Sequence, residues 1–320
     1  MNNLKYNIIV GLLRAVACLP LGVLYVVSDV LAFVAHRVMR YRLKVVRKNL
    51  KNALPERSPQ ELRRIEREFY RYLCDCIVET VKLLHISDEE LQRRIEFRNV
   101  DVVNRPMLDG RHVILYLGHY GNWEWVQATS MIFSGNDISC EIYRPLRNKT
   151  MDRVIRRIRS RFGTLCIPQQ KAVRTLLKLN ADGKRFIVGF ISDQYPNNRN
   201  RRHWTDFLNQ RASYVTGGEE IGRHVDAKFA YLEVDRPRRG HYVMTFKPVE
   251  PPADSPEEYP HTLMFLRMFE EHIRRAPEYW LWSHNRWHHK EPVHEPAKPA
   301  ESAGPAAELR PEPAAEPKEQ

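Results

Sequence analysis

The chain has 320 residues, and its 43% hydrophobic and 28% charged residues are typical of a globular protein of one large or two modest domains. Lys and Arg number 51 against 39 Asp and Glu, which gives a formal net charge of +12. Such an excess suits nucleic acid, an anionic membrane surface, or an acidic or phosphorylated partner. The sequence has no zinc-finger spacing, RNA-binding aromatic signature or basic zipper, so we expect no nucleic-acid partner. Its five Cys form no CxxC pair, which predicts neither a zinc site nor a disulfide framework.

Residues 1–45 predict a membrane anchor with a basic flank. The apolar stretch 8–34 is interrupted by Arg14, Pro20 and Asp29, and it lacks a charge-free run of about 20 residues. A basic cluster follows, as is typical of the cytoplasmic leaflet: Arg37, Arg40, Arg42, Lys44, Arg47, Lys48 and Lys51. We therefore expect an uncleaved helix that spans or lies on the membrane. A buried core helix and a cleaved signal peptide are the alternatives.

Residues 46–290 alternate between helical and strand patterns, which predicts one α/β domain with a mainly parallel central sheet flanked by helices. Ser58, followed by Pro59 and by Glu61, predicts the start of a long helix. Further helices are expected at 149–161, 171–179 and 258–275, and strands at 112–117, 138–143, 164–167, 185–190, 229–234 and 242–248. The Pro-, Ala- and Glu-rich segment 291–320 predicts a disordered tail.

His119 and Glu124 form the sharpest motif, a His and an acid separated by four residues. Spacing alone is weak evidence, because His85 and Glu90 repeat it at the end of a helical pattern. His119, however, follows the apolar run 113–117 and stands in a turn flanked by glycines, which let a substrate approach the backbone. We predict His119 as general base and Glu124 as the carboxylate that fixes its tautomer. The alternative is a structural His in a tight turn.

Polar residues follow two other predicted strands. Arg144 comes directly after 138–143, and Asp193 lies just beyond 185–190. The carboxyl ends of parallel strands share one edge of a sheet, so we expect both residues near His119. Arg144 suits an oxyanion or a phosphate, and Asp193 suits the orientation of a basic partner. Ordinary loop salt bridges are the alternative.

Together these motifs resemble a known family. The block Gly118-His119-Tyr120-Gly121-Asn122-Trp123-Glu124 resembles the His-x4-acid block of the glycerolipid acyltransferase superfamily, in the form found in late lauroyl and myristoyl acyltransferases of lipid A biosynthesis. The resemblance covers nearly all of residues 1–290, and continues through Tyr143-Arg144-Pro145, Ser192-Asp193-Gln194 and Pro277-Glu278-Tyr279-Trp280-Leu281-Trp282-Ser283-His284. In one departure, Tyr195 follows Gln194 where the family often has Asp.

The resemblance implies an acyltransferase at the cytoplasmic face of the inner membrane, with acyl carrier protein as donor and a lipid A precursor as acceptor. His119 would deprotonate the acceptor hydroxyl with support from Glu124, and no metal or organic cofactor would be required. Asn122, Arg144 and Asp193 match other functional positions, which we expect to bind substrate. An acyltransferase for a lysophospholipid, aminolipid or glycosylated lipid is one alternative, and a non-catalytic lipid-binding membrane protein is another.

Several basic residues acquire expected partners from the same resemblance. Arg147 and the basic residues of the helix predicted at 149–161 are expected to dock the acidic acyl carrier protein. Arg199 and Arg201, which follow the Asp193 loop, are expected to meet phosphates of the acceptor. His284 and His288 have the spacing of a helical ligand pair, but no Glu lies between them, and we predict no metal site.

Overall fold

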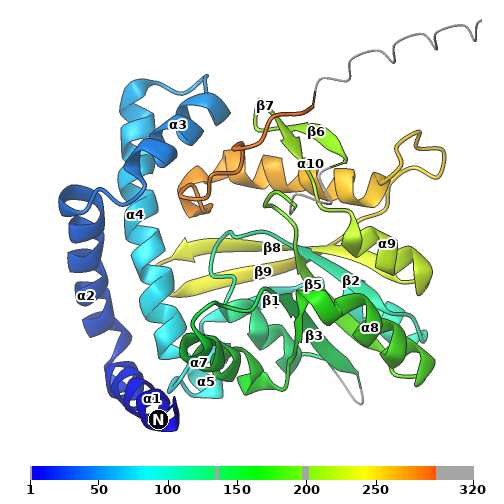
Figure 1. Cartoon of the computed structure of the whole chain (residues 1–320), viewed down its shortest axis with the longest axis horizontal. Helices are drawn as coiled ribbons and strands as arrows, with labels where there is room; N and C mark the ends of the chain where they lie inside the picture. The colour runs from blue at the N-terminus through cyan, green and yellow to red at the C-terminus, as the bar shows by residue number, and fades with distance from the viewer. Residues whose placement is uncertain (1, 134–136, 197–201, 293–320) are drawn as a thin grey trace, which may run out of the picture. The chain divides into compact units, whose positions relative to one another are not determined.

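The computed structural model describes residues 2–133, 137–196 and 202–292 (Figure 1). The chain divides into a compact unit, Met1–Lys290, and a C-terminal segment, Glu291–Gln320. Apart from its first two residues, that segment lies outside the described residues, and so does the predicted disordered tail. The account below concerns the compact unit.

The helices are α1 (Asn2–Cys18), α2 (Leu21–Phe33), α3 (Leu43–Ala53), α4 (Pro59–Lys82), α5 (Asp88–Gln92), α6 (Asp101–Leu108), α7 (Lys149–Arg159), α8 (Ala172–Ala181), α9 (Gly217–His224) and α10 (Pro260–Arg275), with a π-helical turn η1 (Val34–Val38) after α2 and a 3-10 segment η2 (Trp125–Met131) after β2. The strands are β1 (Ile95–Arg98), β2 (Val113–Leu117), β3 (Ile138–Tyr143), β4 (Leu165–Pro168), β5 (Phe186–Ile191), β6 (Trp204–Phe207), β7 (Gln210–Ser213), β8 (Lys228–Arg238) and β9 (His241–Pro248). The long helix begins at Ser58 with both hydrogen bonds of a capping box, as predicted.

Seven strands form one sheet in the order β1-β9-β8-β2-β5-β3-β4, and every neighbouring pair is parallel except β8 with β9. The predicted mainly parallel α/β fold is therefore confirmed. The six predicted strands are all present in this sheet. The short strand β1 and the separate β6–β7 hairpin were not predicted, because each has only four residues and little apolar pattern.

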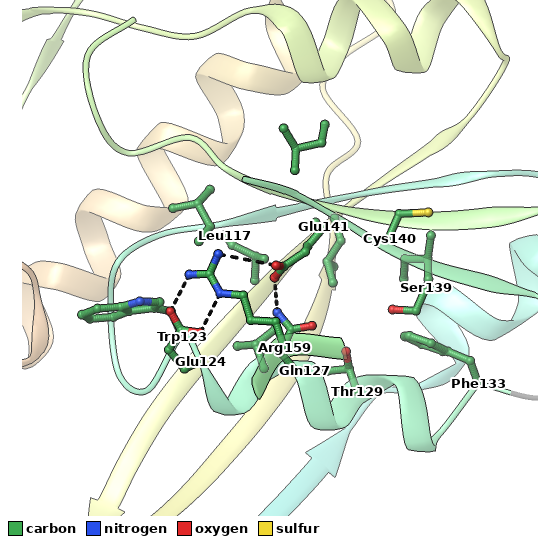
Figure 2. Close-up of a pocket in the computed structure, with 16 residues that line it drawn as sticks. Leu117, Trp123, Glu124, Gln127, Thr129, Phe133, Ser139, Cys140, Glu141 and Arg159 are labelled. Carbon is green, nitrogen blue, oxygen red and sulfur yellow. Dashed lines mark hydrogen bonds and ion pairs between the residues drawn. The ribbon is translucent and has the colours of Figure 1, made fainter. Parts of the chain in front are cut away.

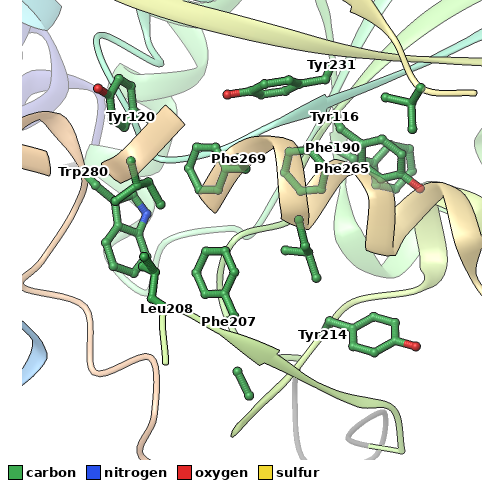
Figure 3. Close-up of a cluster of buried hydrophobic side chains, with 14 of the residues drawn as sticks. Tyr116, Tyr120, Phe190, Phe207, Leu208, Tyr214, Tyr231, Phe265, Phe269 and Trp280 are labelled. Atoms are coloured by element: carbon green, nitrogen blue, oxygen red, sulfur yellow. The ribbon is translucent and has the colours of Figure 1, made fainter. Parts of the chain in front are cut away.

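The central strand β2 is buried on both faces, which explains its uninterrupted apolar sequence. Alternate residues enter two different cores: Ile114 and Tyr116 on one face, Leu115 and Leu117 on the other. On the first face α10 contributes an aromatic cluster, in which Tyr116 stacks on Phe265 with ring centroids 4.8 Å apart (Figure 3). Helices thus cover both sides of the sheet, and α10 lies over the strand that leads to the His119 turn.

The N-terminal helices α1 and α2 pack along α4, and α2 buries only a narrow stripe there: Leu21, Leu24, Ser28 and Ala32 (Figure 1). Its outer face exposes large apolar side chains, among them Val26, Val30 and Phe33. By length and composition the helix Leu21–Val38 could cross a membrane, with a mean hydropathy of 1.6 and 22% of the segment buried. Because most of this surface is exposed, it is a candidate membrane anchor and not a core helix.

Candidate active site

The turn that carries His119 leaves the end of β2 and is fixed by backbone pairing with the C-terminal segment. The amide of Leu281 donates to the His119 carbonyl at 3.1 Å, and the Gly121 amide donates to the Tyr279 carbonyl at 3.1 Å. A Cβ at Gly118 would lie 2.0 Å from the Phe269 ring, and Gly121 has a φ of +58°. These glycines therefore serve packing and turn geometry, whereas the sequence had suggested room for a substrate.

The carboxylate that contacts His119 is Asp193. The His119 Nδ1 lies 2.7 Å from Asp193 Oδ1, and the Trp280 indole donates to Asp193 Oδ2 at 2.8 Å. The side chain of Asp193 is only 2% exposed. Burial opposes ionisation of this carboxyl, but the charge and hydrogen bond of His119, together with the Trp280 bond, lower its pKa to about 2. The predicted meeting of the β2 and β5 strand ends is confirmed, with Asp193 in contact with His119.

An ionised Asp193 can only accept hydrogen bonds, so the proton of a neutral His119 ring is assigned to Nδ1. This leaves Nε2 as the ring nitrogen that can accept a proton. The His119 side chain is 20% exposed, and the edge of its ring meets Trp123 with centroids 5.4 Å apart. The Gln194 amide nitrogen lies 3.2 Å from Nδ1 and 3.4 Å from Nε2. A half-buried His held in this tautomer by a carboxylate is the arrangement of a general base.

Glu124 does not take the position expected for it next to His119. It forms a two-pronged ion pair with Arg159 of α7, with N–O distances of 2.9 and 2.5 Å. Arg159 also reaches Glu141 of β3 at 3.5 Å. The chain turns after His119 so that Glu124 points toward α7, and the sequence spacing gave no sign of this. The carboxylate in contact with His119 is thus that of Asp193, and not that of Glu124 as predicted.

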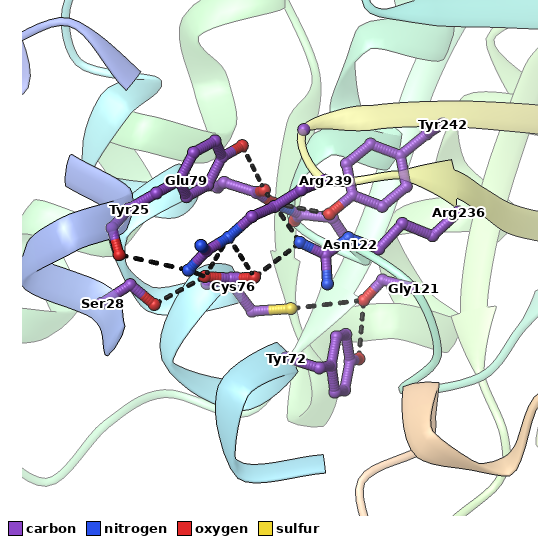
Figure 4. Close-up of polar contacts among 12 residues, drawn as sticks. Tyr25, Ser28, Tyr72, Cys76, Glu79, Gly121, Asn122, Arg236, Arg239 and Tyr242 are labelled. Carbon is purple, nitrogen blue, oxygen red and sulfur yellow. Dashed lines mark hydrogen bonds and ion pairs between the residues drawn. The ribbon is translucent and has the colours of Figure 1, made fainter. Parts of the chain in front are cut away.

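Asn122 is part of the frame beneath the turn. Its buried side chain accepts hydrogen bonds from the amides of Glu124 and Trp125, each at 3.1 Å, and donates to Glu79 of α4 at 2.6 Å (Figure 4). The same Glu79 accepts from Tyr25 of α2 at 2.8 Å. These contacts of Asn122 hold the turn in place, and its expected contact with substrate stays a prediction. They connect the turn through α4 to the candidate membrane anchor.

A narrow pocket of about 40 Å³ lies beside the Glu124–Arg159 pair (Figure 2). Its lining combines this pair and Trp123 with mostly apolar side chains from β2, β3, β5, η2 and the residues just after η2: Leu115, Leu117, Val126, Phe133, Ile142, Ile187 and Ile191. Trp123 therefore borders both the pocket and the His119 ring. The volume is enough for about one water molecule, so a larger ligand enters only when lining side chains move.

The structure places the other predicted residues as follows. Arg144 and Arg147 are exposed just beyond β3, the strand next to β5 in the sheet, and the described residues offer neither of them an acidic partner. Arg199 and Arg201 lie outside the described residues. From the sequence, Arg159 was expected only as one of several cations of its helix, and no role at the site was predicted for Trp280. No local pattern distinguishes these two residues, because their contacts at the site are with residues distant in sequence.

The basic helix α7 is only partly available as a docking surface. Arg159 points inward, and the Arg157 guanidinium lies 3.4 Å from the Tyr6 hydroxyl of α1. Arg153 lies over the Tyr6 ring at 4.0 Å, and Arg156 pairs with Asp152 within the helix. Arg144 and Arg147, which follow β3, remain exposed cations next to this helix.

Comparison with known proteins decides the family. The family model "Bacterial lipid A biosynthesis acyltransferase" matches residues 2–289. The chain belongs to this family. It is 25% identical over 284 residues to the lipid A biosynthesis lauroyltransferase of Escherichia coli (strain K12), covering 87% of this chain and 89% of that relative. It is 24% identical over 271 residues to the lipid A biosynthesis palmitoleoyltransferase of the same organism, covering 84% and 86%.

The lipid A biosynthesis acyltransferase of Haemophilus influenzae (strain ATCC 51907 / DSM 11121 / KW20 / Rd) is similar at 19% identity over 252 residues, covering 78% of this chain and 76% of the relative. As a member of the family, the chain is an acyltransferase, and the family resemblance seen in the sequence is confirmed. This result also sets aside the alternative of a non-catalytic lipid-binding protein.

Proposed function

We propose that this protein transfers a fatty acyl chain from the thioester of acyl carrier protein to a hydroxyl of a lipid A precursor, with His119 as general base. The contact between His119 and the buried Asp193 carries this proposal, because it leaves Nε2 as an acceptor at a partly exposed strand end. The similarity to lipid A biosynthesis lauroyltransferase and palmitoleoyltransferase supports the lipid A acceptor.

In the proposed reaction His119 Nε2 removes the proton of the acceptor hydroxyl, whose oxygen attacks the thioester carbonyl carbon. The tetrahedral intermediate then collapses, the carbon–sulfur bond breaks, and the new ester forms. The leaving thiolate takes up the proton held on Nε2. Asp193 stabilises the imidazolium between the two proton transfers, as a buried carboxylate does for a catalytic His.

Glu124 supports catalysis by fixing the Arg159 guanidinium at the pocket, and not by contacting His119. A guanidinium held there is suited to stabilise developing negative charge on the carbonyl oxygen. Arg144 and Arg147, exposed beyond β3, suit an acidic carrier protein or a phosphate, and Arg199 and Arg201 keep their predicted role toward acceptor phosphates. The apolar N-terminal helix and its basic flank support attachment to the cytoplasmic face of the inner membrane.

The test is a transfer assay in detergent with labelled acyl–acyl carrier protein against lipid A precursors and lysophospholipids. We expect transfer to a lipid A precursor, and a loss of at least 10²-fold with His119→Ala. His85→Ala is the matched control: four residues also separate this His from an acid, but it is exposed and its Glu90 pairs with Arg94 at 2.9 Å. Transfer only to another lipid removes the lipid A acceptor. Full activity of His119→Ala refutes the general base.

A further inference from the structure

The structure has a second pocket, which shares no lining residue with the pocket beside Arg159. It has a volume of about 320 Å³ and lies between the end of α2, the π-helical turn η1 and the outer side of α4. We call it the α2–α4 pocket, and its lining is Asp29, Ala32, Phe33, His36, Arg37, Arg67, Tyr70 and Arg71. Single π-helical turns are often found at functional sites, and this one supplies two of these residues.

The charges around the α2–α4 pocket leave an excess of guanidinium groups. Arg37 and Arg67 are exposed, and neither has an ion-pair or hydrogen-bond partner among the described residues. Arg71 faces Asp29 at 3.5 Å, but Asp29 already pairs with Arg239 at 2.9 Å. The pocket therefore has positive charge that the protein itself does not neutralise, which suits an anion with several acceptor oxygens.

The His36 imidazole is held in place at the pocket by the buried Glu66, which lies 2.8 Å from its Nε2, and by stacking on Tyr70. Glu66 in turn is satisfied by Arg47 at 2.7 Å. The floor of the pocket is thus fixed by internal pairs, whereas Arg37 and Arg67 at its rim have no partner among the described residues.

The apolar surroundings indicate what kind of anion reaches this pocket. Phe33, which lines it, is 63% exposed, and Val30 one turn earlier is 59% exposed. The candidate membrane helix ends here, and the basic segment that begins with Arg37 follows. This is the boundary at which an amphipathic anchor meets the lipid head groups, with apolar side chains on one side and cations on the other.

We propose that the α2–α4 pocket binds the phosphate of an anionic membrane phospholipid, whose acyl chains lie along the exposed apolar face of α2. Arg37, Arg67 and Arg71 hold the phosphate, and Phe33 contacts the start of the chains. This site anchors the enzyme at a defined depth and is separate from the site that acylates its acceptor. It does not depend on the proposed donor, acceptor or catalytic base.

Native mass spectrometry of the full chain in detergent tests the proposal, with phosphatidylglycerol as the anionic probe and phosphatidylcholine as the zwitterionic one. We expect one phosphatidylglycerol to bind, at least about tenfold more tightly than phosphatidylcholine. Arg67→Gln should weaken it by about tenfold, because a charge-assisted hydrogen bond is lost. Arg63→Gln is the matched control: it removes the same charge from an exposed position one turn earlier on α4, outside the pocket. It should change binding less than twofold.

Arg67 has no ion-pair or hydrogen-bond partner among the described residues, so its replacement should leave the melting temperature unchanged and keep the result interpretable. Arg37→Gln, on the opposite wall, should reproduce the loss. An equal loss with Arg63→Gln would show diffuse attraction to the charged helix and overturn the site. Unchanged binding in Arg67→Gln and Arg37→Gln would do the same. Inorganic phosphate that competes at its own micromolar affinity would identify a free-anion site and reject the lipid.

Discussion

Replacing Asp193 by Asn keeps the shape of the side chain but removes its charge and one of its two acceptor oxygens. In the native site these oxygens accept from His119 Nδ1 at 2.7 Å and from Trp280 Nε1 at 2.8 Å. An amide has one oxygen for these two donors. If it accepts from the buried Trp280, its NH2 group faces Nδ1 and favours the tautomer with the proton on Nε2, which cannot accept a proton from the substrate.

The pKa of Asp193 indicates how strongly its contact with His119 favours the charged carboxylate, which the substitution removes. Burial by itself would raise the pKa of Asp193, yet the pKa falls from 3.8 to about 2, chiefly through His119. Each pKa unit corresponds to about a tenfold change in equilibrium, so this fall of nearly two units favours the ionised carboxylate beside His119 by roughly 10². With the unfavourable tautomer included, we expect kcat to fall by about 10³ to 10⁴, with KM changed little.

The assay is steady-state transfer from acyl–acyl carrier protein to a lipid A precursor, with melting temperatures recorded for each variant. Asp182→Asn is a matched control. It makes the same chemical change at a residue that is exposed at the end of α8 and does not contact the site. It should retain activity within twofold. A folded Asp193→Asn enzyme with kcat within threefold of the wild type would refute the role of Asp193 as the partner of a catalytic His.

Three further predictions concern stability and pH. Glu124→Gln should lower the free energy of unfolding by about 2–4 kcal/mol in urea denaturation, because it leaves the Arg159 guanidinium, only 18% exposed, without its main partner; unchanged stability would contradict this. Gly118→Ala should cost about 1–3 kcal/mol by the same measurement, since its Cβ would meet the Phe269 ring at 2.0 Å, and a neutral effect would show that α10 shifts freely. The folded-state pKa of Asp193 lies below its unfolded value of 3.8, so its stabilising effect is present above that pH and is lost as the pH falls through about 2. Acid titration by circular dichroism should therefore show a shallower loss of stability below pH 4 in Asp193→Asn, and an identical slope would contradict the shift.

The N-terminal helices join the catalytic domain through polar contacts as well as apolar ones. Ser28 donates to the buried Asp75 at 2.6 Å, and Arg236 and Arg239 from the end of β8 and the following turn hold the same carboxylate at 2.6 and 2.5 Å (Figure 4). A helix that was merely tethered to the domain would not need such buried pairs. The candidate anchor is therefore an integral part of the fold.

The sequence was sufficient for the class of fold and for the location of the site. Runs such as residues 113–117 are apolar because the strand is buried on both faces, and Ser58 with Glu61 fixes a helix start through purely local hydrogen bonds. Such signals depend on neighbours in the chain and can be read from it. The position of His119 at the end of a buried strand belongs to the same class of inference.

Only the tertiary structure decided which acid serves His119. Glu124 is five residues away in sequence, but the turn held by Asn122 directs it to Arg159, whereas Asp193 is 74 residues away and in contact. That contact exists because β5 is the neighbour of β2, and strand order is not encoded in the apolar pattern of a strand. The apolar pattern shows that a strand is buried but not which strand lies beside it, because backbone hydrogen bonds between strands are alike whichever strands are paired. The choice of neighbour comes from side-chain packing of the whole domain, and with it comes the carboxylate that contacts His119.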